Sequence, residues 1–210
     1  MENAAGFKLG SNLADTFLIF SLRHHRISPY FFNAGLFSTG SLLASIGRCY
    51  AQTIVSSGVK FDVLFGPAYK GIPLVSITSL ILFTEFGMDV KYCYNRKEAK
   101  THGEGGSIVG AKLEGRVLVL DDVITAGTAI RESTDLIAKV GAELAGVVVA
   151  IDRQEKGRAE KSAIQEVEEE FGVPVLTVIN LGNIIEYVEK KGGREEQLAL
   201  MREYRVTYGV

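Results

Sequence analysis

The chain alternates between stretches whose hydrophobic residues recur with a helical period and short, continuous hydrophobic runs. The first clear helix is predicted between a capping Ser38 or Thr39 and Gly58, because apolar side chains share one helical face there. Further helices are predicted at 72–86, from about 129 to 140, and at 162–171, 183–191 and 194–204. Short buried strands are predicted at 61–65, 90–95, 116–120, 145–152 and 173–180.

This alternation predicts the fold class. A strand, a helix and a second strand within one short segment imply a right-handed crossover and parallel pairing. We therefore expect an α/β domain of three layers, with a mostly parallel central sheet and helices flanking both of its faces. Ligands of such a sheet bind beyond the carboxyl ends of the strands.

One segment does not follow the alternation. Residues 96–115, RKEAKTHGEGGSIVGAKLEG, are rich in glycine and have almost no hydrophobic period, so they are predicted to form a loop. This is long for a connection inside a compact domain, and loops of such length are usually functional or disordered.

Composition narrows the class of protein. With 210 residues, 47% of them hydrophobic, the chain fits one domain, 1–210, with a sizeable core. Its 23 basic and 25 acidic side chains nearly balance, which argues against general binding to nucleic acid or to membrane surfaces. Cys49 and Cys93 form no CxxC pair, so no disulfide framework or zinc site is indicated. No apolar run approaches the ~20 residues needed to span a bilayer, and no N-terminal signal is recognised, so a cytoplasmic protein is expected.

Polar residues directly follow three of the predicted strands. Asp121 and Asp122 follow the strand 116–120, residues 68–70 follow the strand 61–65, and Arg153 follows the strand 145–152. Because parallel strands end at one edge of a sheet, these residues are expected to converge on one crevice.

The sequence after the two acids, TAGTA at 125–129, suits an anion. It has small residues, hydroxyls and backbone N–H groups at a helix start, where the macrodipole attracts a phosphate. Since Asp121 and Asp122 would repel a phosphate, we assign them a different role, either to accept hydrogen bonds from a ribose diol or to bind a magnesium that carries phosphates. Taken alone, an Asp-Asp pair before a helix is at least as often a cap and a solvated turn.

Two better-known phosphate loops lack support. GGSIVGAK at 105–112 is spaced like a Walker loop, but it has no Gly-Lys-Ser/Thr and precedes a strand. No GxGxxG opens a helix either. A nucleotide hydrolase and a Rossmann dehydrogenase thus lose their main sequence evidence.

Five motifs together resemble a known family. VLVLDDVITAGTA is similar to the phosphoribosyl diphosphate motif of type I phosphoribosyltransferases. SPYFFNAGLF, FGPAYKGIPL, YNRKEAKTHGEGG and AIDRQEKGR, in this order from about Ser28 onward, together resemble orotate phosphoribosyltransferases. The resemblance implies one phosphoribosyltransferase domain with an N-terminal hood at 1–37 and a mobile active-site loop at 96–115.

The resemblance also implies an activity: transfer of ribose 5-phosphate from phosphoribosyl diphosphate to N1 of orotate, with Mg²⁺, in pyrimidine synthesis. Asp121 and Asp122 would hold the ribose hydroxyls, residues 125–129 the 5′-phosphate, and a strained loop at 68–70 the diphosphate. The Mg²⁺ would be held mainly through substrate and water, without direct protein ligands. The residues implied at phosphoribosyl diphosphate are Tyr69, Lys70, Arg96, Lys97, Lys100, His102, Asp121, Asp122, Val123, Ile124, Thr125, Ala126, Gly127, Thr128 and Ala129.

On the orotate side the resemblance implies Phe31, Phe32 and Thr125 near the ring and Arg153 at the carboxylate. Without the motifs, adjacent aromatics are more often core packing, and a single arginine is a surface charge. Arg23 stands where the family has a substrate-contacting lysine, although a guanidinium is larger and does not titrate.

The N-terminal segment departs from the family pattern. His24 and His25 replace small residues and are expected to be exposed loop residues instead of metal ligands. The first 17 residues form a poor helix, since Gly6 and Gly10 interrupt it.

The segment 96–102 concentrates positive charge at Arg96, Lys97, Lys100 and His102. A charge run of this kind is normally a solvated surface. Over a substrate with several negative charges, however, a basic lid neutralises the departing diphosphate and excludes water. The resemblance implies a homodimer in which 96–102 completes the neighbouring subunit's site, with Lys97 acting in its own chain. Lys100 is expected to stabilise the leaving group, and with Asp121 and Asp122 it forms the predicted catalytic set.

Two other functions stay open. A relative of this fold could bind phosphoribosyl diphosphate as a regulatory signal without catalysis, but the orotate-side residues and the basic segment are present in this chain. A phosphoribosyltransferase for a purine base would share the ribose-phosphate loop but should lack SPYFFN and DRQE.

Overall fold

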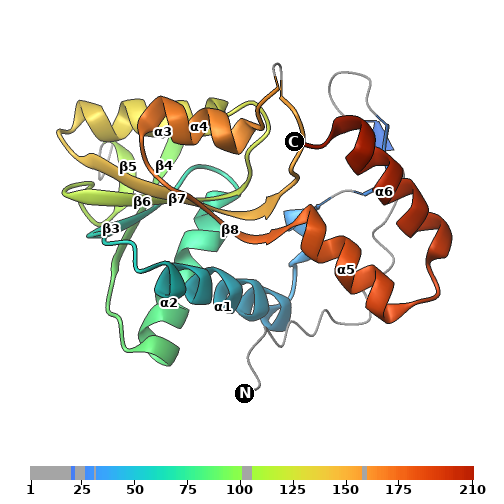
Figure 1. Cartoon of the computed structure of the whole chain (residues 1–210). Coiled ribbons are helices and arrows are strands. Elements are labelled where there is room, and N and C mark those ends of the chain that lie inside the picture. The colour runs from blue at the N-terminus through green and yellow to red at the C-terminus, as the bar shows by residue number, and fades with distance from the viewer. Residues whose placement is uncertain (1–19, 22–26, 31, 101–105, 158–159) are drawn as a thin grey trace.

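The computed structural model describes residues 20–21, 27–30, 32–100, 106–157 and 160–210. At its centre lies a six-stranded sheet in the order β5-β4-β3-β6-β7-β8 (Figure 1). Parallel pairing joins β4 (Lys91–Lys100), β3 (Val63–Gly66), β6 (Arg116–Val123), β7 (Glu143–Asp152) and β8 (Val175–Asn180). The edge strand β5 (Gly106–Gly110) runs antiparallel to β4. The predicted mostly parallel sheet is confirmed.

Two pairs of helices cover the sheet and complete three layers. The helices α1 (Gly40–Ser57) and α2 (Gly71–Phe86) lie on one face, and α3 (Thr128–Lys139) and α4 (Ala163–Phe171) lie on the other (Figure 1). Neighbouring strand residues face opposite sides: Leu118 packs into the core under α1 and α2, while Val119 packs into the core under α3 and α4. Burial on both faces explains why these strands are continuous apolar runs.

A third cluster of buried side chains lies beyond the carboxyl ends of β7 and β8. There α5 (Leu181–Lys191) and α6 (Glu195–Tyr208) pack with Tyr30 and Ile151, beside the main sheet in Figure 1. In the N-terminal segment, β1 (Phe20–Ser21) pairs antiparallel with β2 (Ile27–Ser28), and Ala34–Leu36 form a 3-10 turn. Most of the predicted hood, 1–37, lies outside the described residues.

The helix boundaries follow from local chemistry. The Thr39 hydroxyl accepts a hydrogen bond from the Leu42 N–H at 3.3 Å, and Gly58 ends the helix in the left-handed conformation with φ 68°. Ser162 and Asn180 begin α4 and α5 with reciprocal capping boxes. These signals are visible in the sequence, which is why helix positions were predicted to within a few residues.

Two predicted loops are wrong in part. Residues 121–123 belong to β6, where Asp121 pairs with Val149 and Val123 pairs with Ile151 of β7. In a buried sheet, backbone pairing on a neighbouring strand outweighs the low strand preference of aspartate.

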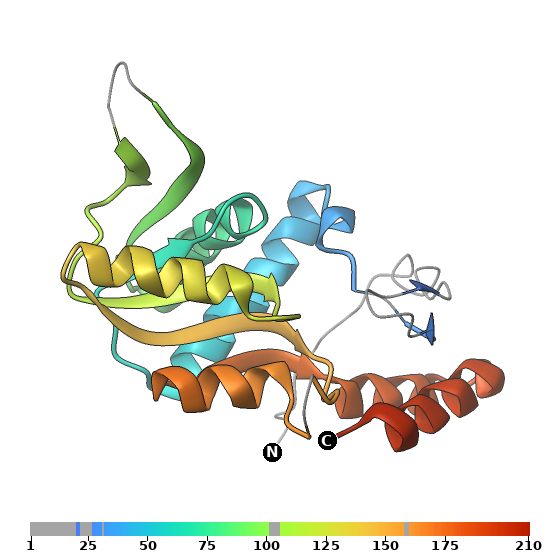
Figure 2. The ribbon, with the colours of Figure 1, turned by 90° about the horizontal axis from the view of Figure 1, so that it is seen from above.

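The second correction concerns the segment 96–115. Residues 96–100 form the outer part of β4 and residues 106–110 form β5, and the two strands pair as an arm that projects from the sheet (Figure 2). Because an exposed two-stranded arm needs no buried face, its strands lack the hydrophobic alternation that would have identified them. Residues 101–105 lie outside the described part.

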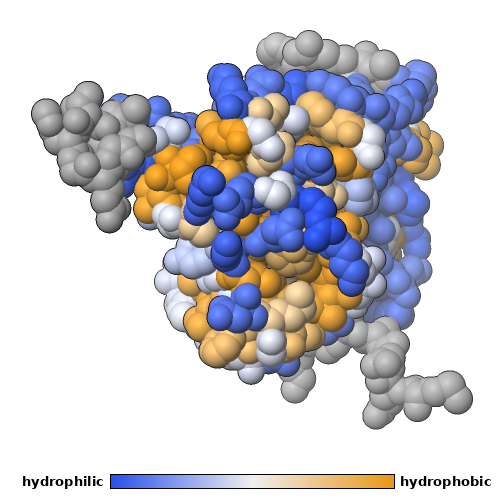
Figure 3. All heavy atoms as spheres, turned by 90° about the vertical axis from the view of Figure 1, so that its left-hand side faces the viewer, coloured by the Kyte–Doolittle hydropathy of each residue, from blue (hydrophilic) through white to orange (hydrophobic). Residues whose placement is uncertain are grey.

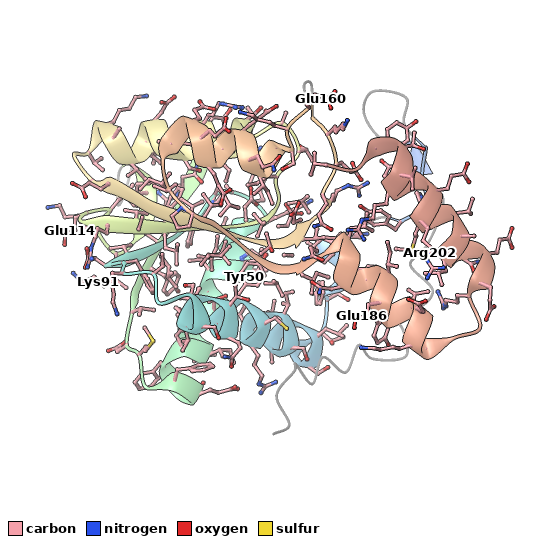
Figure 4. The ribbon with its side chains drawn as sticks, viewed as in Figure 1. Tyr50, Lys91, Glu114, Glu160, Glu186 and Arg202 are labelled. Atoms are coloured by element: carbon pink, nitrogen blue, oxygen red, sulfur yellow. The ribbon has the colours of Figure 1, made fainter. Side chains whose placement is uncertain are left out.

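The starts of the strands form a charged end of the molecule. Hydrophilic side chains gather at the centre of this face in Figure 3, and Figure 4 labels Lys91 and Glu114 there. Lys91 pairs with Glu114 at 3.5 Å, and Arg116 pairs with Asp62 at 3.1 Å. Among the residues that the structure describes, no helix is long and apolar enough to cross a bilayer.

A hydrogen bond across layers ties α1 to the end of β6, and it yields a stability prediction. The Tyr50 hydroxyl, fully buried beneath the sheet (Figure 4), donates to the Asp121 carbonyl at 2.7 Å. In Tyr50→Phe the buried carbonyl loses this partner, so the free energy of unfolding should fall by about 1–3 kcal/mol in urea titrations. Tyr187→Phe, at a half-exposed tyrosine of α5, is the control and should change it by less than about 0.5 kcal/mol. Equal effects would contradict the assignment.

Candidate functional site

The two adjacent acids occupy the buried end of β6. Asp121 is 8% exposed and Asp122 is 7% exposed. The Asp121 carboxylate accepts the Asp122 N–H at 2.9 Å, and the Asp122 carboxylate accepts the Val123 N–H at 2.9 Å. Each carboxylate is thus oriented by the backbone of the residue that follows it.

Lys70 brings a second strand end to this pair. The Lys70 ammonium lies 2.5 Å from Asp122 Oδ2, although 52 residues separate the two in the sequence. Lys70 directly precedes α2, so the β3–α2 connection meets the end of β6 as predicted. Most of the lysine side chain is exposed, which leaves its charge accessible to an anion.

The connection between β3 and α2 is fixed by close packing. A Cβ atom on Gly66 would lie 2.3 Å from the Gly71 carbonyl oxygen, and one on Gly71 would lie 2.9 Å from the Leu120 carbonyl oxygen. Asn95 at β4 accepts the Ala68 N–H at 2.7 Å. The peptide bond between Ala68 and Tyr69 is cis, in the loop for which the resemblance implies an unusual backbone.

The loop after β6 enters α3 through glycine. Gly127 is the N-cap, with φ 71°, and has no side chain to satisfy the N–H groups of the first turn. The guanidinium of Arg131 donates to the Ala126 carbonyl at 2.6 Å and pairs with Glu170 of α4 at 2.7 Å. Arg131 therefore holds the Ala126 carbonyl toward α3. The N–H groups at the start of α3 have no side-chain cap and are suited to bind a phosphate.

These elements enclose one pocket of about 650 Å³. The loop 123–130 forms one wall, and the ends of β3 and β4 form the other. Its lining residues are Pro67, Ala68, Asn95, Arg96, Lys97, Asp121, Val123, Ile124, Thr125, Ala126, Gly127, Thr128, Ala129, Ile130, Glu132 and Ser133.

The pocket combines cations with a buried acid whose pKa is raised. Burial raises the pKa of Asp121 to about 6; the Asp122 N–H and the Lys70 charge oppose the rise, and the Asp122 charge adds to it. Lys97 lies over the Tyr69 ring, with Nζ 5.2 Å from the ring centroid, and Tyr69 is 68% exposed. Cations therefore lie at the rim, whereas the acids lie at the base.

Arg153 occupies a different environment, just beyond β7. Its guanidinium lies 4.4 Å from the centroid of the Tyr30 ring and donates to Glu155 and to the Ser28 hydroxyl. The described lining of the 650 Å³ pocket does not include Arg153, so the expected convergence of three strand ends on one crevice holds for two of them. Val123 connects the two places, since it lines the pocket and packs against the cluster of Tyr30.

The other orotate-side residues are placed only in part. Phe32 is half-buried between two core clusters and packs against Phe37, with centroids 6.0 Å apart, as the core-packing alternative describes. Arg23, His24, His25, Phe31 and His102 lie outside the described residues. Lys100 ends β4, and its side chain is likewise outside the described part.

Some residues of the site were missed. Asn95 could have been found, because it is the last residue of the predicted strand 90–95, at the end of the sheet where ligands bind. Arg131 gave no signal, since an arginine on a polar helix face is ordinary. Tyr30 and Glu155 stood inside quoted motifs, but their contacts join segments 125 residues apart.

The described residues contain no group of three or more His, Cys, Asp or Glu side chains arranged to hold a metal ion. The carboxylates that line the pocket are Asp121 of β6 and Glu132 of α3. Their charge is compatible with a cation that also binds an anionic ligand.

Comparison with known proteins agrees with this geometry. A sequence model of the phosphoribosyl transferase domain matches residues 37–176, which contain the sheet from β3 to β7 and the pocket. Together, the fold and the site define a phosphoribosyltransferase.

Relatives that match along most of the chain identify the family within this class. Orotate phosphoribosyltransferases from Photobacterium profundum and Thioalkalivibrio sulfidiphilus are 57% and 60% identical over 191 residues, 91% of this chain and 90% of each relative. The crystal structure of orotate phosphoribosyltransferase from Francisella tularensis matches with a TM-score of 0.82 and 46% identity, over 92% of this chain and 93% of that chain. The chain belongs to the orotate phosphoribosyltransferase family, which confirms the resemblance seen in the sequence.

The raised pKa of Asp121 predicts a pH-dependent stability. The pKa is about 6 in the folded protein, against an ordinary value of 3.8, so burial of the ionised form opposes folding above pH 6 and not below pH 4. Asp121→Asn can keep the hydrogen bond from the Asp122 N–H. Its free energy of unfolding should therefore exceed that of the wild type by roughly 1–3 kcal/mol at pH 8, and the difference should vanish toward pH 4. Urea unfolding at both pH values measures it. A matched change at exposed Asp135 should gain nothing at either pH, and a pH-independent gain in Asp121→Asn would contradict burial of the charge as the cause.

Proposed function

We propose that this protein transfers the ribose 5-phosphate group of phosphoribosyl diphosphate to N1 of orotate, giving orotidine 5′-phosphate and diphosphate in pyrimidine synthesis. The observation that carries the proposal is the position of Asp121, the ends of β3 and β4 and the α3 start around one pocket, in a chain of this family. Lys70 pairs with Asp122, the neighbour of Asp121. Each half of a phosphorylated ribose finds chemically matched groups there.

The ribose-phosphate end is assigned first. Asp121 and Asp122 accept hydrogen bonds from the two ribose hydroxyls, since buried carboxylates are acceptors that neutral hydroxyls satisfy. The loop 125–129 binds the 5′-phosphate through backbone N–H groups at the start of α3, with the side chains of Val123 and Ile124 closing the wall. Phosphate and carboxylates thus contact opposite ends of one ribose and do not meet.

The diphosphate end takes the cations. Lys70 and Tyr69 lie on the β3–α2 connection, and Arg96 and Lys97 lie on β4 across the pocket from the phosphate loop. Their positive charge compensates the diphosphate as it departs. In the proposed dimer, Arg96, Lys100 and His102 act on the diphosphate bound at the neighbouring subunit's site, with Lys100 as its catalytic stabiliser, whereas Lys97 acts in its own chain.

Orotate is placed at the border of the pocket and the Arg153 cluster. Arg153 pairs with the orotate carboxylate, and Phe31, Phe32 and Thr125 contact the ring. Arg23 is assigned a weaker contact to substrate. Val123 and Thr125 stand between ribose and base, since both line the pocket and Val123 also adjoins the Tyr30 cluster.

The chemistry needs positioning and charge more than a protein nucleophile. The bond from the anomeric carbon to the diphosphate oxygen breaks, with its electron pair leaving on diphosphate, while N1 of orotate bonds to that carbon. Positive charge develops on the ribose ring, and the buried carboxylates lie where they stabilise it. When bound, Mg²⁺ would neutralise more of the negative charge of the diphosphate. Asp121 and Asp122 would contact the ion indirectly, through the ribose hydroxyls and water.

The proposed assembly is a homodimer in the cytoplasm. The β4–β5 arm projects away from its own sheet (Figure 2), which supports the proposal that the segment 96–102 completes a neighbouring subunit's site. Cys49 and Cys93 are unpaired thiols, as expected in a reducing compartment.

The function is tested by following the loss of orotate absorbance with phosphoribosyl diphosphate and Mg²⁺. Parallel reactions replace orotate with uracil, hypoxanthine or adenine. Turnover of orotate well above that of the other bases is expected. No turnover of any base, with retained binding of phosphoribosyl diphosphate, would favour a regulatory protein, and preference for a purine would place the chain among purine enzymes.

The ribose assignment of Asp122 predicts a selective defect. Asp122→Asn removes a charged acceptor and the partner of Lys70, so kcat/KM for phosphoribosyl diphosphate should fall about 10- to 100-fold with little change in KM for orotate. Initial rates with one substrate varied at a time measure both constants. Comparable losses for both substrates would count against the assignment, and Asp135→Asn on exposed α3 serves as the unaffected control.

A further inference from the structure

The arginine assigned to orotate is held by a carboxylate that has no assigned role. Glu155 Oε1 lies 2.9 Å from Arg153 Nε and 2.6 Å from Arg153 Nη2. The same oxygen accepts the Tyr30 hydroxyl at 3.1 Å. Three donors therefore converge on one carboxylate oxygen, and two of them belong to the same guanidinium edge.

The ring of Tyr30 fixes the plane of that guanidinium. Arg153 Cζ lies 4.4 Å from the ring centroid, and Tyr30 is only 2% exposed, so the ring cannot move aside without disturbing the core. Tyr204 of α6 supports the ring from its edge, with centroids 6.2 Å apart. Stacking sets the plane of the guanidinium, and Glu155 sets its rotation within that plane.

The segment that carries both charges is itself anchored. The Lys156 N–H donates to the Tyr208 carbonyl at 2.8 Å, and the Val210 N–H donates to the Gln154 carbonyl at 3.0 Å. The backbone from 154 to 156 thus pairs with residues 208–210 beside the end of β7. The side chains of Arg153 and Glu155 are 13% and 14% exposed, which makes their pairing one of low solvent access.

We infer that Glu155 is a positioning residue that holds Arg153 for the carboxylate of the pyrimidine substrate and thereby sets the preference for orotate over uracil. Uracil has the same ring without the carboxylate, so only orotate gains from an oriented Arg153. Loss of Glu155 would leave a long guanidinium side chain to sample several rotamers, and a misplacement of about 1 Å can cost as much as 10²-fold in rate. The inference rests on the proposed function, because it takes Arg153 as the partner of the orotate carboxylate.

The test compares four proteins: wild type, Glu155→Ala, Arg153→Met and the double variant. In Glu155→Ala, kcat/KM for orotate should fall about 10- to 100-fold, whereas residual turnover of uracil and KM for phosphoribosyl diphosphate should stay near wild type. In the Arg153→Met background, the further loss of Glu155 should have no effect on orotate, since Glu155 acts through Arg153. Glu155→Gln keeps an acceptor oxygen and should restore most of the orotate rate.

A matched control and the contrary outcomes complete the design. Glu160 lies five residues along, is labelled at the edge of Figure 4 and is 87% exposed in its pair with Lys156, so Glu160→Ala should change none of these constants. Equal losses for orotate and uracil in Glu155→Ala, or additive losses in the double variant, would overturn the inference while leaving the proposed function intact. If circular dichroism shows that Glu155→Ala is unfolded, Glu155→Gln is measured instead. A loss of orotate turnover alone, smaller than the loss in Arg153→Met, supports positioning. An equal loss of orotate and uracil turnover refutes it. A wild type that turns over no orotate would refute the proposed function itself.

Discussion

Two carboxylates buried side by side at the end of β6 are the constraint around which this structure is arranged. Burial of charge opposes folding, and Asp121 shows it by a pKa raised to about 6. The surrounding contacts offset that cost: backbone N–H groups orient each carboxylate, and Lys70 pairs with Asp122. Tyr50 reaches through the core to satisfy the carbonyl of Asp121. The acids are thus kept desolvated and fixed, which suits their proposed role as acceptors for ribose hydroxyls, because they need not reorganise.

The site has two halves that differ in solvent exposure. At the end proposed for the diphosphate the cations are exposed: 62% of the Lys70 side chain is accessible, and Tyr69 beneath Lys97 is exposed as well. Exposed cations would suit the leaving group of the proposed reaction, which must both bind and depart. At the end proposed for the pyrimidine ring, Arg153 is largely buried and fixed by stacking and ion pairing. A preorganised guanidinium loses little freedom on binding, which suits recognition of a single planar carboxylate.

Much of this arrangement could be predicted from the sequence because its signals are local. The caps at Thr39 and Gly58, the apolar runs of β3, β6 and β7, and the small residues at 125–129 identify the elements and the phosphate loop without knowledge of their neighbours. The extension of β6 through Asp121 and Asp122 could not be predicted in this way, since it depends on pairing with β7. The β4–β5 arm likewise depends on strand pairing alone. The cluster of Tyr30, Arg153 and Glu155 joins residues far apart in the chain, and no periodicity identifies such a contact.

The meeting of Lys70 with Asp122 depends on a contact that only glycine permits. At the end of β3 the chain turns into α2 so tightly that a side chain on Gly66 would overlap the Gly71 carbonyl, and one on Gly71 would overlap the turn at 66–67 and the end of β6. This close approach of three backbones sets how near the start of α2 lies to the acids. With a wider turn, the lysine of the β3–α2 connection would stand away from the carboxylates, and the groups proposed to bind the diphosphate would separate from those proposed to bind the ribose. The chemistry of the site therefore depends on two residues that have no side chain, because they bring the charged residues within reach of each other.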